Sequence, residues 1–373
     1  MKNNIPMKWM RRTIPVATAL AVLSIFAAGC SAGTSATNGA TKAVVNDAAQ
    51  KLIAEASQKI TVWSGPAKGP AAAPPKTIGV ISCAQGAEGC VREAQGVTEA
   101  AKAIGWKVIN IDGQGDPQRQ LAGMNSLLDQ HVDAIVLGSI SAASIGDGMQ
   151  RAKSMKVPVI AVVSPDPKPF GGLTSVGPDD NKAGRVLGAY VVSNGGGNVA
   201  VFDHNENPAV ADRGKGFRSE LKSLGSTKIL YDEAVTLSQI GPPEQQIMSA
   251  FLQSHPQGSV DWIYAGFDAM LAPLVQTADR SGRKELKAVS IDGNLQNLAW
   301  IRAGTIEAAT VAYPLEWAGW GAVDDLNRVF AGQNIVDQGI PFRLLTKNNL
   351  PAVGQPFDGD YNFRAEYTKL WQR

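Results

Sequence analysis

From residue 77 onward, the sequence alternates between short apolar runs and longer stretches with a helical spacing of apolar residues. Strand-like runs occupy residues 77–82, 107–111, 133–137, 157–163, 198–203, 262–264 and 288–291. Helical stretches separate them, for example at 117–130, 142–155, 182–193 and 209–224. Strands that alternate with such helices form βαβ units, so the pattern predicts parallel sheets covered by helices. The alternation pauses after Val176 and then starts again, which predicts two similar α/β lobes.

Composition narrows the class of protein further. The chain has 373 residues, which suits about two domains at the usual size of about 100–200 residues each. Hydrophobic residues make up 44% of it, too many for a disordered chain. Lys and Arg number 35 against 33 Asp and Glu, so the basic excess that a nucleic-acid partner requires is missing. Three cysteines are too few for a disulfide-dense scaffold.

The first 29 residues have the organisation of an export signal. An apolar run over 14–28 follows four basic residues, Lys2, Lys8, Arg11 and Arg12. That run has about fifteen residues, fewer than the ~20 that span a bilayer as a helix. It ends in Ala-Ala-Gly-Cys at residues 27–30, which resembles a bacterial lipobox in which Cys30 becomes the lipid-modified N-terminus. Alanine at position 27 stands where lipoboxes prefer leucine, so an ordinary secretory signal is the alternative.

Removal of residues 1–29 takes away four cations and no acids, so the formal net charge falls from +2 to −2. The mature chain is therefore expected to be an exported, mildly acidic lipoprotein, held at the membrane by acyl chains. Residues 30–76 are expected to form its tether. Residues 31–40 are small and polar, apolar residues recur every four positions over 44–56, and 64–75 contain four prolines. The globular part is expected to begin near Lys76.

Local sequences in the globular part resemble one known family. They are Thr-Ile-Gly-Val-Ile at 77–81 with Gly-Trp-Lys-Val at 105–108, Val-Pro-Val-Ile at 157–160, Arg-Gly-Lys-Gly-Phe at 213–217, Asp-Ala-Met at 268–270 and Ile-Asp-Gly at 291–293. In this order and spacing, residues 77–373 are similar to the type I periplasmic binding proteins of the ribose- and galactose-binding kind. The resemblance implies two doubly wound parallel-sheet lobes joined by a three-stranded hinge. Residues 77–177 and 314–341 would form the first lobe, and 178–313 and 342–373 the second.

The same resemblance implies a function. Proteins of this kind capture a small solute between their lobes, close about the hinge and deliver the solute to the permease of an ABC importer. Open α/β sheets bind ligands at the carboxyl ends of their strands, which agrees with the cleft between the lobes that the resemblance implies. For this chain the resemblance favours a sugar, a polyol or a similar hydroxylated solute, without a cofactor, bound by a monomeric protein.

Two charged residues are the leading candidates for ligand contacts. Arg213 occupies the position at which the family presents a ligand-binding arginine, and a guanidinium offers a rigid fork of donors to hydroxyls or to a carboxylate. The alternative role for Arg213 is a surface ion pair with Glu220 or Asp212. Asp292 follows the predicted strand 288–291, and its carboxylate can accept hydrogen bonds from two hydroxyls. The alternative role for Asp292 is to cap a helix that begins at Asn294.

Aromatic and hydroxyl side chains complete the predicted cleft. Tyr313 either contacts the ligand or packs in the hinge. Phe267 and the adjacent Asp268 stand where the family carries cleft residues, although asparagine is common in place of Phe267, whose ring is either a stacking platform or part of the core. Ser139 and Ser141 follow the third strand and are hydroxyl donors or merely turn residues.

The loop after the first strand carries the remaining candidates. Cys83 and Cys90 flank it, and in an oxidising compartment they are expected to form a disulfide, with two buried free thiols as the alternative. Gln85 and Glu88 lie between them and are its candidate polar contacts, because the loop has none of the aromatic residues found in sugar-binding relatives.

Motifs of enzymes and metal proteins are missing from the sequence. His131, His204 and His255 are scattered without a second ligand at metal spacing. The sequence has no Gly-rich loop ending in Gly-Lys-Ser/Thr and no Gly-x-Ser-x-Gly elbow, and no two acids stand out as a glycosidase pair. We therefore expect a binding protein without a metal rather than an enzyme.

Three alternative functions share some of these sequence features. A sensory protein that presents a signal molecule to a receptor kinase could share this fold, and a carbohydrate-hydrolysing enzyme would turn its ligand over. A transcription regulator would need an N-terminal helix-turn-helix, whereas residues 1–76 supply a signal and a tether. Phe267, the Val163-Ser164 pair and the first loop depart from sugar-binding patterns. A less polar solute, or an anion held by Arg213, is therefore the alternative cargo.

Overall fold

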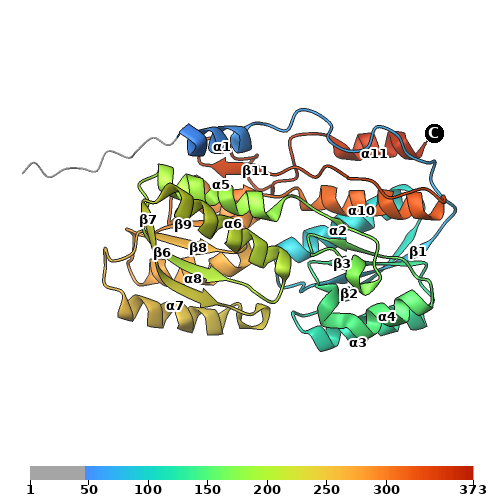
Figure 1. The fold of residues 1–373 in the computed structure, drawn as a ribbon, viewed down its shortest axis with the longest axis horizontal. Coiled ribbons are helices and arrows are strands. Elements are labelled where there is room, and N and C mark those ends of the chain that lie inside the picture. The colour runs from blue at the N-terminus through green and yellow to red at the C-terminus, as the bar shows by residue number, and fades with distance from the viewer. Residues whose placement is uncertain (1–46, 373) are drawn as a thin grey trace, which may run out of the picture. The chain divides into compact units, whose positions relative to one another are not determined.

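The computed structural model describes residues 47–372 and contains two α/β lobes, each built on one sheet (Figure 1). The first sheet has five parallel strands in the order β2-β1-β3-β4-β5. Its strands are β1 (Thr77–Ser82), β2 (Lys107–Asp112), β3 (Ala134–Gly138), β4 (Val159–Val162) and β5 (Ser175–Val176). Every residue of β3 and β4 is buried, which explains why these two runs are apolar throughout.

Four helices cover the first sheet: α2 (Glu88–Ala103), α3 (Pro117–Asp129), α4 (Gly146–Ser154) and α10 (Leu315–Phe330). Successive strand residues point to opposite faces. Ala134 and Val136 accordingly share a core with α2 and α10, whereas Ile135 and Leu137 share a second core with α3 and α4. The alternation along β3 thus builds two hydrophobic cores, one on each face of the sheet.

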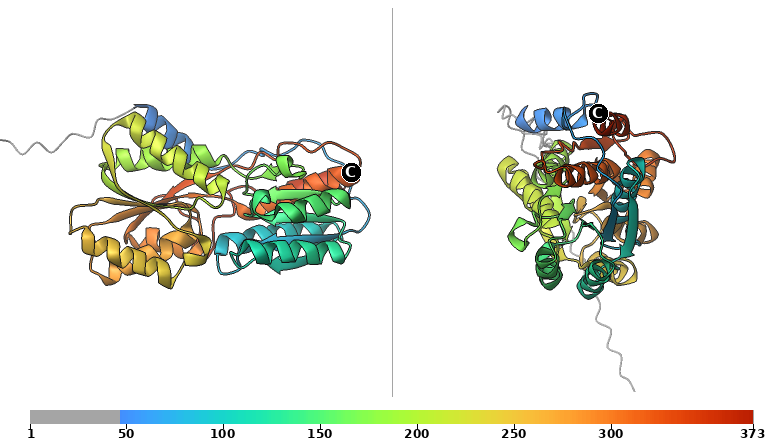
Figure 2. Two further views of the ribbon diagram at one scale, coloured as in Figure 1. Left: turned by 60° about the horizontal axis from the view of Figure 1, so that its bottom comes forward. Right: turned by 90° about the vertical axis from the view of Figure 1, so that its right-hand side faces the viewer.

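The second sheet has six strands in the order β11-β10-β9-β8-β6-β7, and only β11 runs antiparallel to its neighbour. Helices lie on both faces of this sheet (Figure 2). Its strands are β6 (Gly197–Asp203), β7 (Thr227–Ala234), β8 (Trp262–Ala265), β9 (Lys287–Asp292), β10 (Glu307–Ala312) and β11 (Arg343–Thr346). Its helices are α5 (Asp180–Ser193), α6 (Pro208–Leu224), α7 (Pro242–Ser254), α8 (Asp268–Arg280) and α9 (Leu295–Ala303). Short 3-10 turns lie at Ala142–Ile145, Lys168–Phe170 and Leu237–Gln239.

Three connections join the lobes, at residues 177–179, 313–314 and 331–342. Helix α10 follows β10 of the second sheet but packs on α2, β4 and β5 of the first. Strand β11 then returns to the second sheet. The expectation of two doubly wound lobes with a three-stranded hinge is confirmed. Residues 342–373 are expected to belong to the second lobe, but the last helix, α11 (Phe363–Trp371), packs on a helix of the first. Its Trp371 ring stacks on Trp320 of α10 with ring centroids 5.4 Å apart.

The segment before β1 is not a free tether over residues 47–76, so the expectation that the globular part begins near Lys76 is wrong. Helix α1 (Asp47–Ser57) packs on α5 and β11. The following residues 58–76, here called the N-terminal strap, run along the protein to β1 (Figure 1). Trp63 of the strap stacks on Trp317 of α10, with ring centroids 5.4 Å apart and planes 1° from parallel. The Ala73 N–H donates to Asn327 Oδ1 at 2.8 Å. Its prolines resemble a linker in composition, but the strap is held by aromatic stacking and hydrogen bonds.

No helix within residues 47–372 is both long enough and apolar enough to cross a bilayer. The predicted signal peptide (1–29), the lipidated Cys30 and the small polar stretch 31–40 lie outside the described residues.

Two glycines bring α5 and α6 close enough to build the site. A Cβ on Gly184 of α5 would overlap the carbonyl oxygen of Arg213 on α6, and a Cβ on Gly216 would overlap the carbonyl oxygen of Asn181 on α5. Without these Cβ atoms the two helices approach closely. That approach places Arg213 beside Asp180, the first residue of α5.

Candidate ligand-binding site

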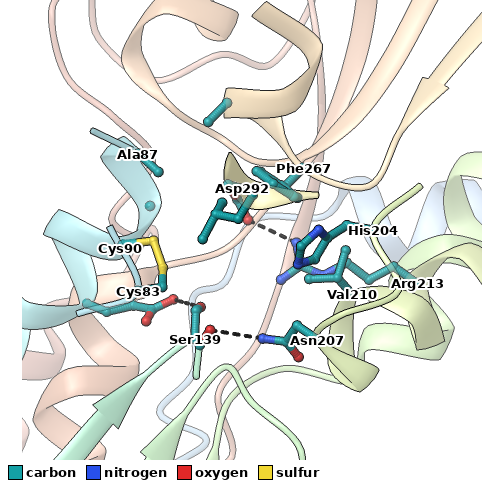
Figure 3. Close-up of a pocket in the computed structure, with 14 residues that line it drawn as sticks. Cys83, Ala87, Cys90, Ser139, His204, Asn207, Val210, Arg213, Phe267 and Asp292 are labelled. Carbon is teal, nitrogen blue, oxygen red and sulfur yellow. Dashed lines mark hydrogen bonds and ion pairs between the residues drawn. A yellow bond between two sulfur atoms is a disulfide. The ribbon is translucent and has the colours of Figure 1, made fainter. Parts of the chain in front are cut away.

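A cavity lies between residues of the two lobes at the carboxyl ends of the parallel strands (Figure 3). The first lobe contributes Cys83, Ala87, Gly89, Cys90, Glu93 and Ser139. The second lobe contributes His204, Asn207, Val210, Arg213, Leu237, Phe267, Ala269 and Asp292. This is the edge at which open α/β sheets bind ligands, because the loops after the strands converge there.

Arg213 is the most strongly held side chain of the cavity. Its Nε donates to Asp180 Oδ1 at 2.7 Å, and its Nη1 donates to Asp292 Oδ1 and to the Gly266 carbonyl, both at 3.2 Å. Burial alone would lower the pKa of the Arg213 guanidinium, but Tyr313, Asp180 and Asp292 together raise it well above its ordinary value. Arg213 therefore stays charged in a buried place, as a residue that orients polar ligand groups must.

Asp292 ends β9 and faces Arg213 across the cavity wall (Figure 3). Its backbone has a positive φ of 135°, an unusual conformation for a residue other than glycine, and such strained residues gather at functional sites. Burial raises the pKa of its carboxyl to about 6, against the opposing effect of Arg213. Asp292 does not cap the helix after Asn294. The N–H of Asn294 donates instead to Asp268 Oδ2 at 2.7 Å.

Phe267 and Ser139 also line the cavity. The Phe267 ring meets the His204 ring edge-on, with centroids 5.8 Å apart, and forms part of the apolar wall. The Ser139 hydroxyl donates to Glu93 Oε1 at 2.7 Å, and its carbonyl accepts from Asn207 Nδ2 at 3.0 Å (Figure 3). The second of these hydrogen bonds runs directly from one lobe to the other.

Five of the predicted contacts lie elsewhere. Tyr313 is buried behind Arg213 and donates its hydroxyl to Asp180, so it supports the guanidinium from outside the cavity. Ser141 lines an adjoining recess. Gln85 is exposed on the outer surface, with its N–H bonded to Asp112. Glu88 accepts from the Leu295 N–H of the second lobe at 2.9 Å.

The fifth, Asp268, belongs to a buried polar network below the cavity. Its carboxylate accepts from the Ser290 and Thr310 hydroxyls as well as from Asn294. Ser290 also bonds Glu307 Oε1 at 2.9 Å, and Asn297 Nδ2 donates to Glu307 Oε2 at 2.9 Å. Because a hydroxyl has one proton to donate, the pattern is satisfied when a protonated Glu307 donates to Ser290 and Ser290 donates to Asp268.

This network predicts a pH effect on stability. Burial, and then the charge of Asp268, raises the pKa of Glu307 well above its ordinary value. Glu307 thus keeps its proton in the folded protein and loses it on unfolding. The stabilisation that Glu307 contributes is therefore complete below its pKa in the unfolded chain, and it is lost as the pH rises through its pKa in the folded protein. The free energy of unfolding should fall with pH by up to about 1.4 kcal/mol per pH unit from this group. Chemical denaturation at a series of pH values should show that the free energy of unfolding of Glu307→Gln falls less steeply with pH than that of the wild type. The free energy of unfolding of Glu55→Gln, on the surface of α1, should fall as steeply as that of the wild type. Equal slopes in all three proteins would contradict the assignment.

The structure joins Cys83 and Cys90 in a disulfide within the cavity wall, with Cα atoms 5.7 Å apart (Figure 3). The bridge ties the loop after β1 to the first turn of α2 and presents an apolar surface to the cavity. It holds the loop in place before a ligand arrives, which lowers the ordering cost of binding.

Replacing both cysteines by serine should lower the free energy of unfolding by about 2–3 kcal/mol, because the unfolded chain gains loop entropy. Thermal unfolding of the double variant should show this loss, and wild-type protein with dithiothreitol should behave alike. A double variant as stable as the oxidised wild type would contradict the expectation.

Three polar residues of the cavity were not predicted from the sequence: Glu93, His204 and Asn207. Asn207 precedes Pro208 and caps α6 with its side-chain oxygen, a helix-start signal visible in the sequence. His204 follows β6, as ligand residues in such sheets do, and one of its ring nitrogens, Nδ1, bonds the Val235 carbonyl at 2.9 Å. Glu93 lies on α2 with no local signal at all. Among residues 47–372, no group of three or more His, Cys, Asp or Glu side chains is arranged to hold a metal ion.

Comparison with known proteins agrees with this architecture. The family model described as "Periplasmic binding protein domain" matches residues 78–334. The ribose import binding protein RbsB of Bacillus subtilis is 26% identical over 250 residues, which are 65% of this chain and 77% of that protein. The fructose import binding protein FruE of Bifidobacterium longum is 26% identical over 260 residues, again 65% and 77%. The crystal structure of an ABC sugar transporter subunit from Rhodobacter sphaeroides covers 74% of this chain and 99% of its own, with a TM-score of 0.67 and 22% identity.

The chain therefore belongs to the periplasmic binding protein family, in the type I class that includes the ribose-binding proteins. The predicted family and fold are confirmed. Members of this family work outside the cytoplasmic membrane as binding proteins.

Proposed function

We propose that this protein captures a small hydroxylated solute, a sugar or a polyol, between its lobes and delivers it to the permease of an ABC importer. The observation that carries the proposal is the cavity at the strand ends, which is lined by the charged Arg213 and its partner Asp292 from the second lobe and by Ser139 from the first. Arg213 and Asp292 would bind ligand hydroxyls, Phe267 would contact an apolar face of the ring or chain, and Ser139 would close the site from the first lobe.

Named relatives support this class of cargo. They include binding proteins for ribose, fructose and xylitol. The alternative cargo, an anion held by Arg213, is less well supported. Arg213 already pairs with Asp180 and Asp292, so an added anion would meet two carboxylates as well as the guanidinium.

Thermal unfolding of residues 31–373 tests the proposal, with D-ribose, D-fructose, xylitol and succinate as separate additions. A ligand at about a thousand times its dissociation constant adds roughly 4 kcal/mol to stability. Each kcal/mol moves the midpoint by about 2–4 °C, so binding would be plain. A shift with a sugar or polyol supports the proposal. A shift with succinate alone would replace it with an organic-acid carrier. Recovery of the ligand unchanged after long incubation separates binding from hydrolysis.

We also propose that Cys30 is lipid-modified and holds a monomeric protein at the outer face of the membrane. The lipobox-like residues 27–30 support this. Cells fed labelled palmitate should incorporate it into the wild type and not into Cys30→Ser. Equal labelling of both would rule out Cys30 as the site.

A further inference from the structure

Glu93, on the second turn of α2, is only 2% exposed, and it lines the cavity. Its Oε1 accepts from the Ser139 hydroxyl at 2.7 Å, whereas its Oε2 is buried without a hydrogen-bond partner among residues 47–372. Gly138 gives this oxygen its space, because a Cβ there would lie 3.0 Å from Oε2. A buried carboxyl oxygen left unpaired costs about 1–3 kcal/mol or more, so its place in the wall calls for a partner.

The polar groups around Glu93 are already committed to other partners. Arg92, its neighbour on α2, pairs through Nε and Nη2 with Glu316, each at 2.8 Å, and its Nη1 donates to the Asn294 side chain and the Asp292 carbonyl. Asn207 Nδ2 donates to the Ser139 carbonyl. Arg213, across the cavity, bonds Asp180, Asp292 and the Gly266 carbonyl. These groups are thus engaged elsewhere, and the cavity that Glu93 lines is where a partner for Oε2 would come from.

We propose that Glu93 determines specificity by binding the solute as an uncharged carboxylic acid, whose Oε2–H donates to a solute hydroxyl oxygen while Oε1 accepts from Ser139. This inference rests on the proposed function and adds a contact from helix α2 to it. The pair Glu93 and Ser139 would select a solute that places an uncharged, hydrogen-bond-accepting group against the first lobe.

The surroundings of Glu93 favour the uncharged form. No cation bonds its carboxyl, since Arg92 and Arg213 point their donors elsewhere. Burial raises the pKa of Glu93 well above its ordinary value, and the nearby Asp292 raises it further, against the Ser139 hydrogen bond and the two arginines. His204 faces the same cavity from the end of β6, with Nδ1 engaged by Val235. In its uncharged form Glu93 has one donor to offer, and that donor is at Oε2.

The test compares Glu93→Met and Glu93→Gln with the wild type by isothermal titration calorimetry against D-ribose, D-fructose and xylitol. Methionine has a similar shape but cannot hydrogen-bond in this way, and replacing a buried unpaired carboxyl by an apolar side chain should keep or raise stability. Glu93→Met should nevertheless bind at least about tenfold more weakly than the wild type. Glutamine keeps an acceptor for Ser139 and an N–H donor in place of Oε2–H, so Glu93→Gln should bind within about threefold of the wild type.

Glu244→Met is the matched control. Glu244 on α7 is likewise buried, and burial raises its pKa to about 9, but it lies outside the cavity. Its replacement should leave the affinity unchanged. Glu93→Met with wild-type affinity would overturn the proposal, as would Glu93→Gln binding as weakly as Glu93→Met. Wild-type protein that binds none of the three solutes would instead overturn the proposed function, so the two failures are distinguishable.

Discussion

Arg213→Ala is expected to abolish measurable solute binding, with a loss of at least about a hundredfold in affinity, and to lower the free energy of unfolding by about 3–5 kcal/mol. Both effects have one cause. The guanidinium is the counter-charge of Asp180 and Asp292, and its removal leaves two buried carboxylates without a cation. It also removes a rigid fork of donors from the cavity.

Arg213→Lys separates the two effects. A lysine keeps the positive charge but loses the fork, so the variant should fold with a smaller loss of stability and still bind more weakly. Arg218→Ala on the same helix is the control, because Arg218 is partly exposed, pairs with Asp203 and Asp232, and does not line the cavity. Calorimetric titration and chemical denaturation of all three variants give both quantities. Arg213→Ala with wild-type affinity would remove Arg213 from the site.

Trp63→Ala is expected to lower the free energy of unfolding by about 3 kcal/mol, which corresponds to about 6–12 °C in the unfolding midpoint. Trp63 holds the N-terminal strap on the first lobe. Its ring lies between Trp317, against which it stacks, and Tyr367, which it meets edge-on with centroids 5.0 Å apart. Its indole N–H donates to the Pro66 carbonyl at 3.1 Å. Alanine loses all of these contacts and leaves a gap beside α10.

Val62→Ala is the matched control for the strap, since Val62 is the preceding residue and is 74% exposed. Its substitution should change stability by less than about 0.5 kcal/mol. If the strap were a tether that touches the lobes only loosely, Trp63→Ala and Val62→Ala would unfold at the same temperature. Thermal unfolding of the two variants beside the wild type decides between these cases.

Predicted site residues line the cavity where a local signal coincides with a strand end. Asp292 closes β9 and Phe267 follows β8, and parallel strands bring such positions to one edge whatever the details of packing. Tyr313 also follows a strand, yet its side chain turns behind Arg213. Strand order places a residue near the cleft, whereas side-chain direction depends on neighbours from other elements.

Local sequence patterns were enough to predict most strands and helices of the lobes and the class of the fold. Apolar runs and helical spacing are properties of neighbouring residues, so the strands β1, β3 and β4 and their helices can be read from the chain directly. The location of a site at the strand ends follows from that order without further information.

The packing of segments that are distant in sequence is visible only in the folded structure. The strap has the composition of a linker, but Trp63 meets Trp317 and Tyr367, which lie some 250 to 300 positions further along the chain. Glu93 has the sequence context of any helical glutamate, and the loop after β3 makes it a cavity residue by bringing Ser139 to its carboxyl. Such contacts depend on how whole helices and sheets are placed, and the periodicity of neighbouring residues carries no record of that placement.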